Sequence, residues 1–300
     1  MGFLVTGGAG FIARRLLPLL TRTGEPVVAV DRHTIPLPFP VRMEAGDVTD
    51  LDRVSALLRT HRVHTVVHLA YWLSAECEAD PFAGTRVNVD GTNVVFEAAR
   101  RSGVRRVVYA SSIAVCGSQA YYGRRRVHED DGLAPVTLVY GATKLVNEVV
   151  GAKYAAQGLD TVGVRLSYVF GHGRTTGAST WASAFASDPA VGRPVTLPFP
   201  PTATFSLLYV DDAARALHAV ATAPALRHRL YFSGGDTVSG RDIVAAVRRH
   251  VPEAAIAFDA RQPALNLVYL PDDGRIRSEL GFTRPSFVER VGDHVREARR

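Results

Sequence analysis

A glycine-rich turn between an apolar run and an amphipathic segment constrains this chain more than any other feature. Residues 6–10 read TGGAG; they follow the apolar residues 3–5 and precede residues 11–20, where apolar side chains recur at helical spacing. The predicted order is therefore strand, glycine turn, helix. Glycine accepts the positive φ of a tight turn and lets a phosphate approach the backbone closely. The helix N-terminus that follows offers unpaired N–H groups to an anion.

The spacing of the small residues matches a dinucleotide-binding fingerprint. Gly7, Gly10 and Ala13 fit the pattern G-x-x-G-x-x-G/A, whose last position is small so that helix and strand pack closely. The next apolar run ends in Asp31, about 20 residues past the turn, where a carboxylate can accept a hydrogen bond from an adenosine ribose hydroxyl. A glycine turn that binds nothing is the alternative. The acid and the strand–helix–strand length favour a bound nucleotide.

NAD is the expected cofactor, because the Asp31 carboxylate would repel the 2′-phosphate of NADP. Arg32 follows directly and offsets part of that repulsion, so NADP stays an alternative. Further cofactor contacts are expected from the start of the first helix, from the ends of later strands and from the segment near residue 140. These residues are Phe11, Ile12, Asp47, Val48, Leu69, Ala70 and Tyr140.

Alternating strand and helix patterns predict an α/β fold. The runs 65–70, 107–110 and 162–166 are apolar without alternation, as in parallel strands covered on both faces. We expect a Rossmann-type, doubly wound parallel sheet with a smaller C-terminal substrate-binding lobe. The predicted dinucleotide-binding domain spans 1–170, with 205–233 returning to it, and the lobe comprises 171–204 and 234–300. Residues 71–81 are expected to form a loop, and residues 171–204, rich in glycine, proline and threonine, are expected to be irregular.

Three side chains are candidates for the chemistry. Tyr140 and Lys144 are four residues apart on a predicted helix and therefore share one face. A tyrosine hydroxyl has an ordinary pKa near ~10, and a neighbouring ammonium lowers it by favouring the phenolate. Ser112, at a strand end, can donate to a substrate oxygen while Tyr140 exchanges its proton. A surface tyrosine and lysine is the alternative. His68 is expected to be a core histidine rather than a catalyst.

Composition excludes several other classes of function. The formal charge of +6 comes from arginines scattered in pairs and one triplet, without the basic stripe and interleaved aromatics of a nucleic-acid surface. No apolar run reaches the length of a membrane span, and no signal peptide is expected. Cys77 and Cys116 indicate neither a disulfide framework nor a zinc site. We therefore expect a cytoplasmic protein with no metal, no nucleic-acid partner and no membrane contact.

The chain resembles the extended short-chain dehydrogenase/reductases, the NAD-dependent epimerase/dehydratase family, over nearly its whole length. The resemblance implies hydride transfer to or from nicotinamide C4, with Ser112, Tyr140 and Lys144 as the catalytic set. It also implies that Lys144 holds the nicotinamide ribose and that Asn88 lies nearby on a supporting helix. The matching motifs are residues 6–12, Asp31, 46–48 (GDV), 68–70 (HLA), 88–93 (NVDGTN), 111–115 (SSIAV), 140–144 (YGATK) and 209–212 (YVDD).

Departures from the family pattern bear on the substrate. Nucleotide-sugar members often carry asparagine where this chain has Tyr168, and an arginine where it has residues 205–208 (FSLL). Both differences weaken the case for a bound sugar diphosphate. Residues 113–114 are Ile-Ala where sugar dehydratases have an Asp-Glu pair, so a 4,6-dehydratase is not expected. The predicted substrate-binding residues are Tyr71, Ser74, Ser112, Tyr168 and His172.

The leading hypothesis is an NAD-dependent oxidoreductase of epimerase/dehydratase type acting on a hydroxyl of a sugar or sugar-like molecule. The alternatives are a simple dehydrogenase or ketoreductase for a smaller hydroxy compound, and a non-catalytic NAD(P)-binding sensor. The helices expected over 83–101 and 137–157 have broad apolar and small-residue faces. The resemblance implies that such helices pair across a two-fold axis, so we expect a homodimer, although a fully buried helix would show a similar pattern.

Overall fold

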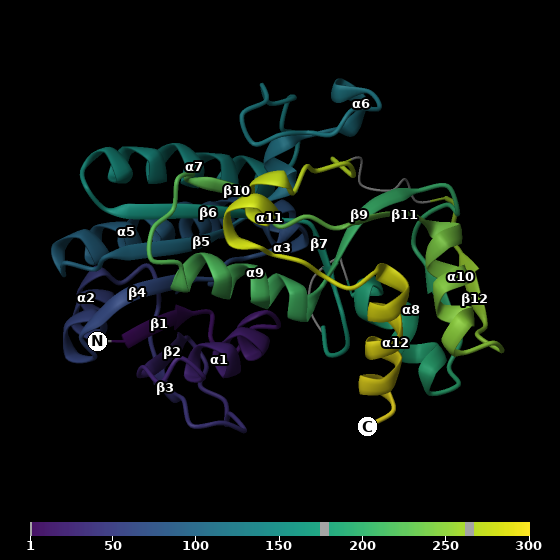
Figure 1. The fold of residues 1–300 in the computed structure, drawn as a ribbon, viewed down its shortest axis with the longest axis horizontal. Helices are drawn as coiled ribbons and strands as arrows, with labels where there is room; N and C mark the ends of the chain where they lie inside the picture. Colours follow the sequence, from purple (N-terminus) through teal and green to yellow (C-terminus); the bar gives the residue numbers. More distant parts are fainter. Residues whose placement is uncertain (1, 175–179, 262–266) are drawn as a thin grey trace.

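A seven-stranded parallel sheet forms the centre of the computed structural model, which describes residues 2–174, 180–261 and 267–300 (Figure 1). The strand order, β10-β6-β5-β4-β1-β2-β3, runs outward from β1 in both directions. The carboxyl ends of β1 and β4 therefore flank a switch point, where such sheets bind ligands. The doubly wound fold is confirmed. The strands are β1 (Gly2–Thr6), β2 (Val27–Asp31), β3 (Arg42–Ala45), β4 (Val63–His68), β5 (Arg106–Ser112), β6 (Asp160–Leu166) and β10 (Leu230–Phe232).

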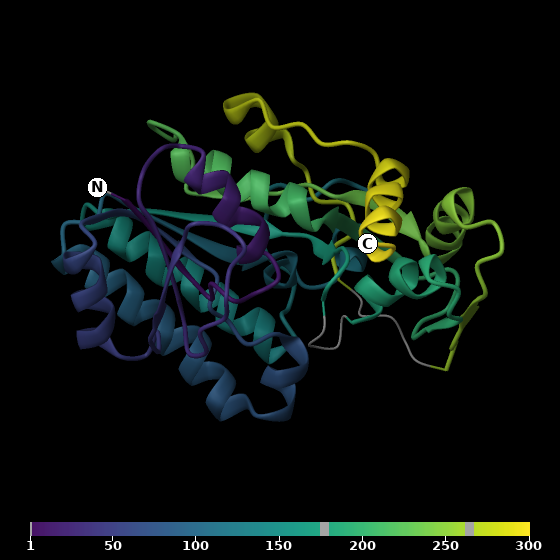
Figure 2. The same cartoon turned by 90° about the horizontal axis from the view of Figure 1, so that it is seen from below.

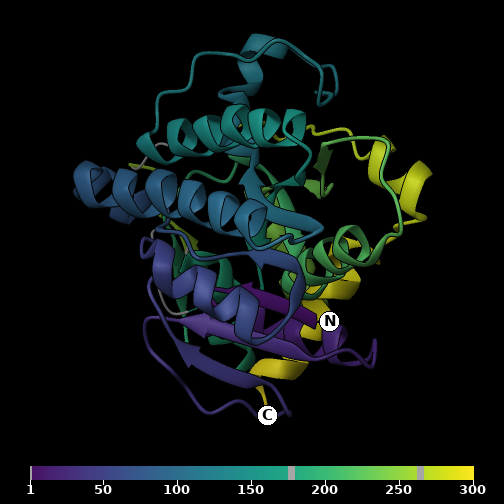
Figure 3. The same ribbon diagram turned by 90° about the vertical axis from the view of Figure 1, so that its left-hand side faces the viewer.

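Helices cover both faces of the sheet because successive strand side chains point in opposite directions. Leu4 belongs to a buried cluster with α2, α5 and the edge of α7, whereas Phe3 and Val5 belong to a cluster with α1 and α9. Figure 3 shows α7, α5 and α2 side by side on one face, and Figure 2 shows α1 and α9 on the other. The bounds are α1 (Ala13–Thr21), α2 (Leu51–Thr60), α5 (Gly91–Arg101), α7 (Val139–Ala156) and α9 (Val210–Thr222).

Helix ends follow the capping signals of the sequence. The Asp50 carboxylate accepts from the Arg53 backbone N–H at the start of α2. Ser239 and Asp242 form a capping box at the start of α10 (Gly240–His250), as their spacing predicts. The helix expected over 83–101 is present in three consecutive pieces: α4 (Pro81–Thr85), a π-helical turn η1 (Arg86–Asp90), and α5.

Two segments that the sequence indicated as irregular contain helices. The stretch 71–81 holds α3 (Ser74–Ala79), and 171–204 holds α8 (Trp181–Ala190). Trp181 and Phe185 of α8 are buried in the core that extends into the smaller lobe. The remaining elements are β7 (Tyr168–Phe170), β9 (Thr204–Tyr209) and β11 (Asp236–Ser239) in one small sheet, β8 (Val195–Leu197) and β12 (Ile256–Phe258) in another, η2 (Ile113–Cys116), α6 (Gln119–Tyr122), α11 (Gly274–Leu280) and α12 (Phe287–Ala298).

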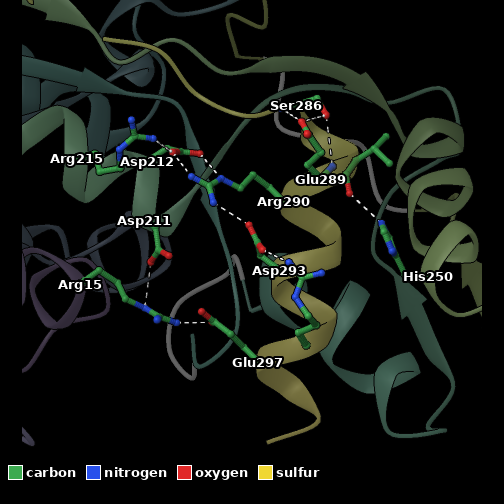
Figure 4. Close-up of polar contacts among 12 residues, drawn as sticks. Arg15, Asp211, Asp212, Arg215, His250, Ser286, Glu289, Arg290, Asp293 and Glu297 are labelled. Carbon is green, nitrogen blue, oxygen red and sulfur yellow. Dashed lines mark hydrogen bonds and ion pairs between the residues drawn. The ribbon is translucent and has the colours of Figure 1, made fainter.

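Helix α12 connects the smaller lobe to the helices of the main sheet (Figure 4). Glu297 on α12 accepts from Arg15 on α1 at 2.5 Å, and Asp211 on α9 lies 3.5 Å from the same arginine. Arg290 on α12 contacts both carboxylate oxygens of Asp212 on α9, at 2.5 and 2.7 Å. Because α1 starts at the glycine turn, these ion pairs tie the C-terminal helix to the element that begins the predicted nucleotide site.

No helix in the described part of the chain is both long and apolar enough to cross a bilayer. Cys77 and Cys116 are buried free thiols, and burial raises the pKa of both, to about 11 and about 12.

Candidate active site

A cavity of about 560 Å³ opens at the carboxyl ends of four neighbouring strands. The loops after β1 and β4, the end of β5 and the segment from β6 into β7 all line it. Nine of the predicted site residues contribute to the cofactor side or the catalytic set of this lining: Gly7, Gly10, Phe11, Ile12, Arg32, Leu69, Ser112, Tyr140 and Lys144. The fold therefore brings these residues together around one cavity.

The glycine turn leaves a backbone surface that no side chain covers. Gly7 has a φ of +67°, and a Cβ built on it would lie 2.7 Å from the Leu69 carbonyl oxygen. A Cβ on Gly10 would lie 2.9 Å from the Gly7 carbonyl oxygen, whose lone pair already accepts from the Gly10 N–H at 2.9 Å. Only glycine fits both positions, and the helix N-terminus begins directly after them. This cradle suits the pyrophosphate of a dinucleotide.

Asp31 ends β2 beside this turn. Its carboxylate accepts from the Ala9 backbone N–H at 3.1 Å, and the following Arg32 lines the cavity. The Asp47 carboxylate accepts from the Thr49 backbone and hydroxyl at 2.9 and 2.8 Å. Asp31, Asp47, Val48 and Ala70 stand next to the cavity rather than in its lining. Their expected contacts with the adenosine end stay predictions.

His68 is a satisfied core residue, as the sequence predicted. It is fully buried; its Nδ1 lies 2.6 Å from the Thr6 hydroxyl and its Nε2 lies 3.1 Å from that of Thr92. Thr92 donates its own proton to the Asn88 carbonyl at 2.6 Å, so it accepts from the histidine. Burial and the nearby Lys144 lower the pKa of His68 to about 3. A neutral histidine thus fixes β1 against β4 beneath the cavity.

The three predicted catalytic side chains meet at the end of β5. Lys144 is almost fully buried and donates from Nζ to the Ala110 carbonyl at 2.6 Å. Its Nζ lies 5.5 Å from the centre of the Tyr140 ring and 2.7 Å from that of Tyr71. Ser112, 9% exposed, hydrogen-bonds to Tyr140. A proton-exchanging hydroxyl, a hydrogen-bonding hydroxyl and an amine therefore share one wall of the cavity.

Burial opposes charge on both central groups. It raises the pKa of Tyr140 to about 12, while the hydrogen bond from Ser112 and the positive charge of Arg174 act in the opposite direction. Burial also lowers the pKa of Lys144 well below its ordinary value. Arg174, which the sequence analysis did not select, therefore adds a positive charge that favours the Tyr140 phenolate.

Asn88 positions the loop after β4. Its amide accepts from the Trp72 backbone N–H at 2.8 Å and donates to the Trp72 carbonyl at 3.0 Å. The same Nδ2 lies 3.2 Å from the hydroxyl of Thr143 on α7, and Asn147 donates to the Asn88 carbonyl at 2.9 Å. Asn88 thus lies on the π-helical turn and joins the loop to α7, the helix that carries Tyr140 and Lys144. Such π-turns occur frequently at functional sites.

On the substrate side, Tyr71, Ser74, Ser112 and Tyr168 line the cavity, and their contact with a substrate stays a prediction. His172 does not: its Nδ1 lies 2.9 Å from the Ser187 hydroxyl on α8, so its ring is directed to that helix instead. The prediction of a substrate contact for His172 is therefore not supported. It rested on position beyond a strand end, and the unpredicted helix α8 supplies the partner that holds the ring.

Two charged residues of the lining were missed by sequence reasoning. Glu76 comes from α3 and Arg174 from the segment after β7. The stretch that contains Glu76 read as a loop, and Arg174 stood among many arginines scattered along the chain. Arg174 could have been selected as a candidate site residue from its position just after a strand, in a glycine-rich stretch (GHGR, residues 171–174).

Comparisons with known proteins place this geometry in a family. The profile of the "NAD dependent epimerase/dehydratase family" matches residues 3–231. UDP-glucose 4-epimerase of Azospirillum brasilense is 31% identical over 220 residues, 69% of this chain but only 60% of that protein. D-erythronate dehydrogenase of Cupriavidus necator is 30% identical over 239 residues, 72% of this chain and 71% of that protein. The structure of Thermus thermophilus UDP-glucose 4-epimerase with NAD matches with a TM-score of 0.88 at 26% identity, over 100% of this chain and 99% of that chain.

Proposed function

The chain belongs to the NAD-dependent epimerase/dehydratase family, and from that membership we propose that it transfers a hydride between NAD and a hydroxyl- or keto-bearing carbon of a small carbohydrate-like substrate. The observation that supports this most is the meeting of Ser112, Tyr140 and Lys144 in the cavity that the glycine turn also lines. When bound, NAD accepts or returns the hydride at nicotinamide C4.

Tyr140 acts as the acid/base in this proposal. In the direction of oxidation, the Tyr140 phenolate accepts the proton of the substrate hydroxyl while the carbon of that hydroxyl loses its hydride, which leaves a carbonyl group. Ser112 donates a hydrogen bond to the reacting oxygen and holds it within reach. Because burial favours the neutral phenol, the phenolate depends on nearby positive charge and on the Ser112 hydroxyl. Lys144, buried beside the ring, orients the cofactor ribose.

A sugar-like hydroxy compound smaller than a nucleotide sugar is favoured by the wall behind Tyr168. Phe205 is 5% exposed and packs its ring against those of Tyr168, Trp181 and Phe199, with centroids 4.7–5.9 Å apart. Ser206 is 1% exposed and its hydroxyl lies 2.9 Å from that of Ser167. Neither Phe205 nor Ser206 offers the cation with which nucleotide-sugar members hold a diphosphate at this position. We therefore keep net dehydrogenation of a smaller hydroxy compound as the second candidate beside epimerisation.

One experiment separates the two candidates and tests the proposal. The purified protein is titrated with NAD and then supplied with a panel of sugars, sugar acids and short hydroxy acids, while reduced nicotinamide is followed by absorbance and the products by mass spectrometry. A dehydrogenase accumulates NADH in proportion to product; an epimerase returns the hydride and forms an isomer without net NADH. Binding of NAD with neither outcome for any hydroxy compound would favour the sensor hypothesis instead.

A homodimer is also part of the proposal. Val146 and Val149 on α7 are 41% and 56% exposed, and Phe82 on the adjoining α4 is 79% exposed. An unpartnered apolar surface of this kind marks an interaction site, and the family resemblance predicts pairing through these helices. Val149→Glu should give a monomer by light scattering, whereas Val191→Glu, at a similarly exposed valine after α8, should stay dimeric. A wild-type monomer at micromolar concentration would contradict this assembly.

The cellular location is likewise proposed rather than observed. Two buried free cysteines suit a reducing cytoplasm. Fractionation of the source cells tests it.

A further inference from the structure

Arg174 is a partly buried cation that lines the cavity, and no described carboxylate forms an ion pair with it. Its Nη1 donates to the Val169 carbonyl at 3.1 Å, and its buried Nε has no hydrogen-bond partner among the described residues. Two other arginines of low exposure differ: Arg165 makes a two-point contact with Glu148 at 2.8 and 2.9 Å, and Arg290 contacts Asp212. No ion pair joins Arg174 to a described acid, and the ranges 175–179 and 262–266 contain no Asp or Glu in the sequence.

No carboxylate in the described part of the chain therefore contacts Arg174 directly. Burial lowers the pKa of its guanidinium, while the hydroxyls of Tyr168 and Tyr140 and the carboxylate of Glu76 act in the opposite direction from farther away. An unpaired buried charge costs free energy, so a fold that retains one gains when a ligand supplies the opposite charge. NAD does not supply it here, because the nicotinamide end that must lie near Tyr140 carries no negative group.

Glu76 is an unpartnered acceptor on the same cavity. Its Oε2 is buried without a hydrogen-bond partner among the described residues, and its side chain lines the cavity from α3. Glu76 and Arg174 are not in ion-pair contact with each other, so each is left for the ligand. Of the charged lining residues, Arg32 adjoins the adenosine-side acid and Lys144 the catalytic tyrosine. That leaves one cation and one anion for the substrate.

We infer that the substrate is a small hydroxy acid whose carboxylate pairs with Arg174 and whose second donor group, a hydroxyl or an ammonium, faces Glu76. This inference rests on the proposed function, since it places the oxidised hydroxyl at Tyr140. A guanidinium matches a planar carboxylate with two parallel N–H groups. A doubly charged phosphate suits the site less, because Glu76 would repel it. Arg174 and Tyr140 line the same cavity, so the carboxylate and the reacting hydroxyl belong to one small molecule.

The size of the cavity agrees with a short carbon chain. Pockets of roughly 300–1,000 Å³ hold one drug-sized ligand. The cavity of about 560 Å³ is lined by the glycine turn as well as by Tyr140, so it must hold the pyrophosphate and nicotinamide parts of the cofactor beside the substrate. Leu138, Trp72 and Leu267 supply apolar contact for the carbon skeleton between the polar groups. A substrate with a nucleoside diphosphate would need more space and more positive charge than this lining provides.

The test compares acids with their neutral counterparts on NAD-loaded protein. The pairs are D-erythronate and erythritol, 3-hydroxybutyrate and its amide, and L-threonine and L-threoninol, with NADH formation as the readout. Within the pair that it uses best, the wild type should have a kcat/KM for the acid at least about thirtyfold higher than for the neutral counterpart. Removing one partner of a charge pair in a site changes the binding free energy by enough to give a ratio of that size. Arg174→Gln should remove this preference through KM while NAD affinity stays unchanged. Arg193→Gln, an exposed arginine, is the matched control.

Glu76→Gln identifies the second donor group. If the variant loses turnover of the amino-hydroxy acid alone, an ammonium faces Glu76. If it keeps turnover of the polyhydroxy acid, a hydroxyl faces Glu76, because the glutamine amide oxygen can also accept a hydrogen bond from a hydroxyl. Either result supports the inference. Equal use of acids and neutral counterparts by the wild type, or an acid preference that survives in Arg174→Gln, overturns it.

A binding measurement separates this inference from the proposed function. Butyrate lacks the reacting hydroxyl, so calorimetric titration of NAD-loaded protein with butyrate requires no turnover. Binding should be lost in Arg174→Gln and kept in Tyr140→Phe. If Tyr140→Phe turns over the acids normally, the proposed mechanism fails although the acid site stands. If butyrate binds Arg174→Gln as it binds the wild type, the acid site fails although the mechanism stands.

Discussion

Replacing Gly7 with alanine tests the cofactor cradle. The new Cβ would lie 2.7 Å from the Leu69 carbonyl oxygen and 2.8 Å from the Ala70 nitrogen, closer than the 3.0 Å that Cβ atoms observe. Both neighbours are backbone atoms, so the turn itself must move. The φ of +67° adds about 1–2 kcal/mol for a residue with a Cβ. A charged hydrogen bond is worth about 1.5–3 kcal/mol, so losing one phosphate contact should raise the dissociation constant of NAD roughly ten- to hundredfold.

Gly103 supplies the matched control. It has the same φ of +67°, but a Cβ there would meet nothing within 4 Å. Gly103→Ala should therefore lower the unfolding free energy by about 1–2 kcal/mol and leave NAD affinity unchanged. Calorimetric NAD titration and urea unfolding of both variants give the two quantities. If Gly7→Ala binds NAD with wild-type affinity, or if both variants lose affinity equally, the glycine turn is not the phosphate cradle.

Three further predictions concern cofactor choice, pH dependence and stability. The wild type should bind NADH more tightly than NADPH, and Asp31→Asn should narrow that difference in a fluorescence titration; tighter NADPH binding by the wild type would refute the role of Asp31. Burial lowers the pKa of both His68 and His294 to about 3, so below their unfolded pKa of about 6.5 only the unfolded chain takes up these protons. The unfolding free energy should then fall as pH drops from about 6 to about 4, by about 1.4 kcal/mol per pH unit for each histidine. In urea unfolding of His294→Gln, the slope of unfolding free energy against pH should be shallower by that amount. An unchanged slope would contradict the role given to His294. Asp212→Asn removes the two-point partner of the Arg290 guanidinium, which is 14% exposed and keeps its ion pair with Asp293. The substitution should lower the unfolding free energy by about 1.5–3 kcal/mol, the range for a hydrogen bond to a charged group, in the same assay; a loss below about 1 kcal/mol would assign the pair to the weak surface class.

The parts of the site that lie on regular elements could be predicted from sequence. Gly7 and Gly10 follow a strand, Ser112 ends another, and Tyr140 and Lys144 share a helix face, so strand ends and helical spacing suffice to bring them to one edge of the sheet. His68 was assigned to the core correctly because it lies within an unbroken apolar run. In each case a local pattern determines where the side chain points.

The parts that depend on tertiary contacts could not be predicted in this way. The helix α8 has no strong periodicity because it is buried nearly all round, and without it the partner of His172 was invisible. Arg174 and Glu76 both line the cavity, and neither forms an ion pair with a described residue. The spacing of residues in the sequence does not show this, because ion pairs depend on tertiary contacts. The effect of Lys144 on Tyr140 follows from a spacing of four residues and stays a prediction. Arg174 also acts on Tyr140, but it comes from a distant segment, so no spacing connects the two residues.

The most direct test of the central claim is turnover and NAD affinity in Tyr140→Phe, measured beside the wild type on the substrate found in the panel. The substitution removes only the phenolic oxygen, so NAD should bind within a factor of two or so of wild type while turnover falls by about 10²–10⁴-fold, the usual contribution of general acid–base catalysis. Tyr121→Phe, at a tyrosine 63% exposed on α6, should leave both quantities unchanged. A Tyr140→Phe protein that keeps near-normal turnover would contradict the assignment of Tyr140 as the acid/base.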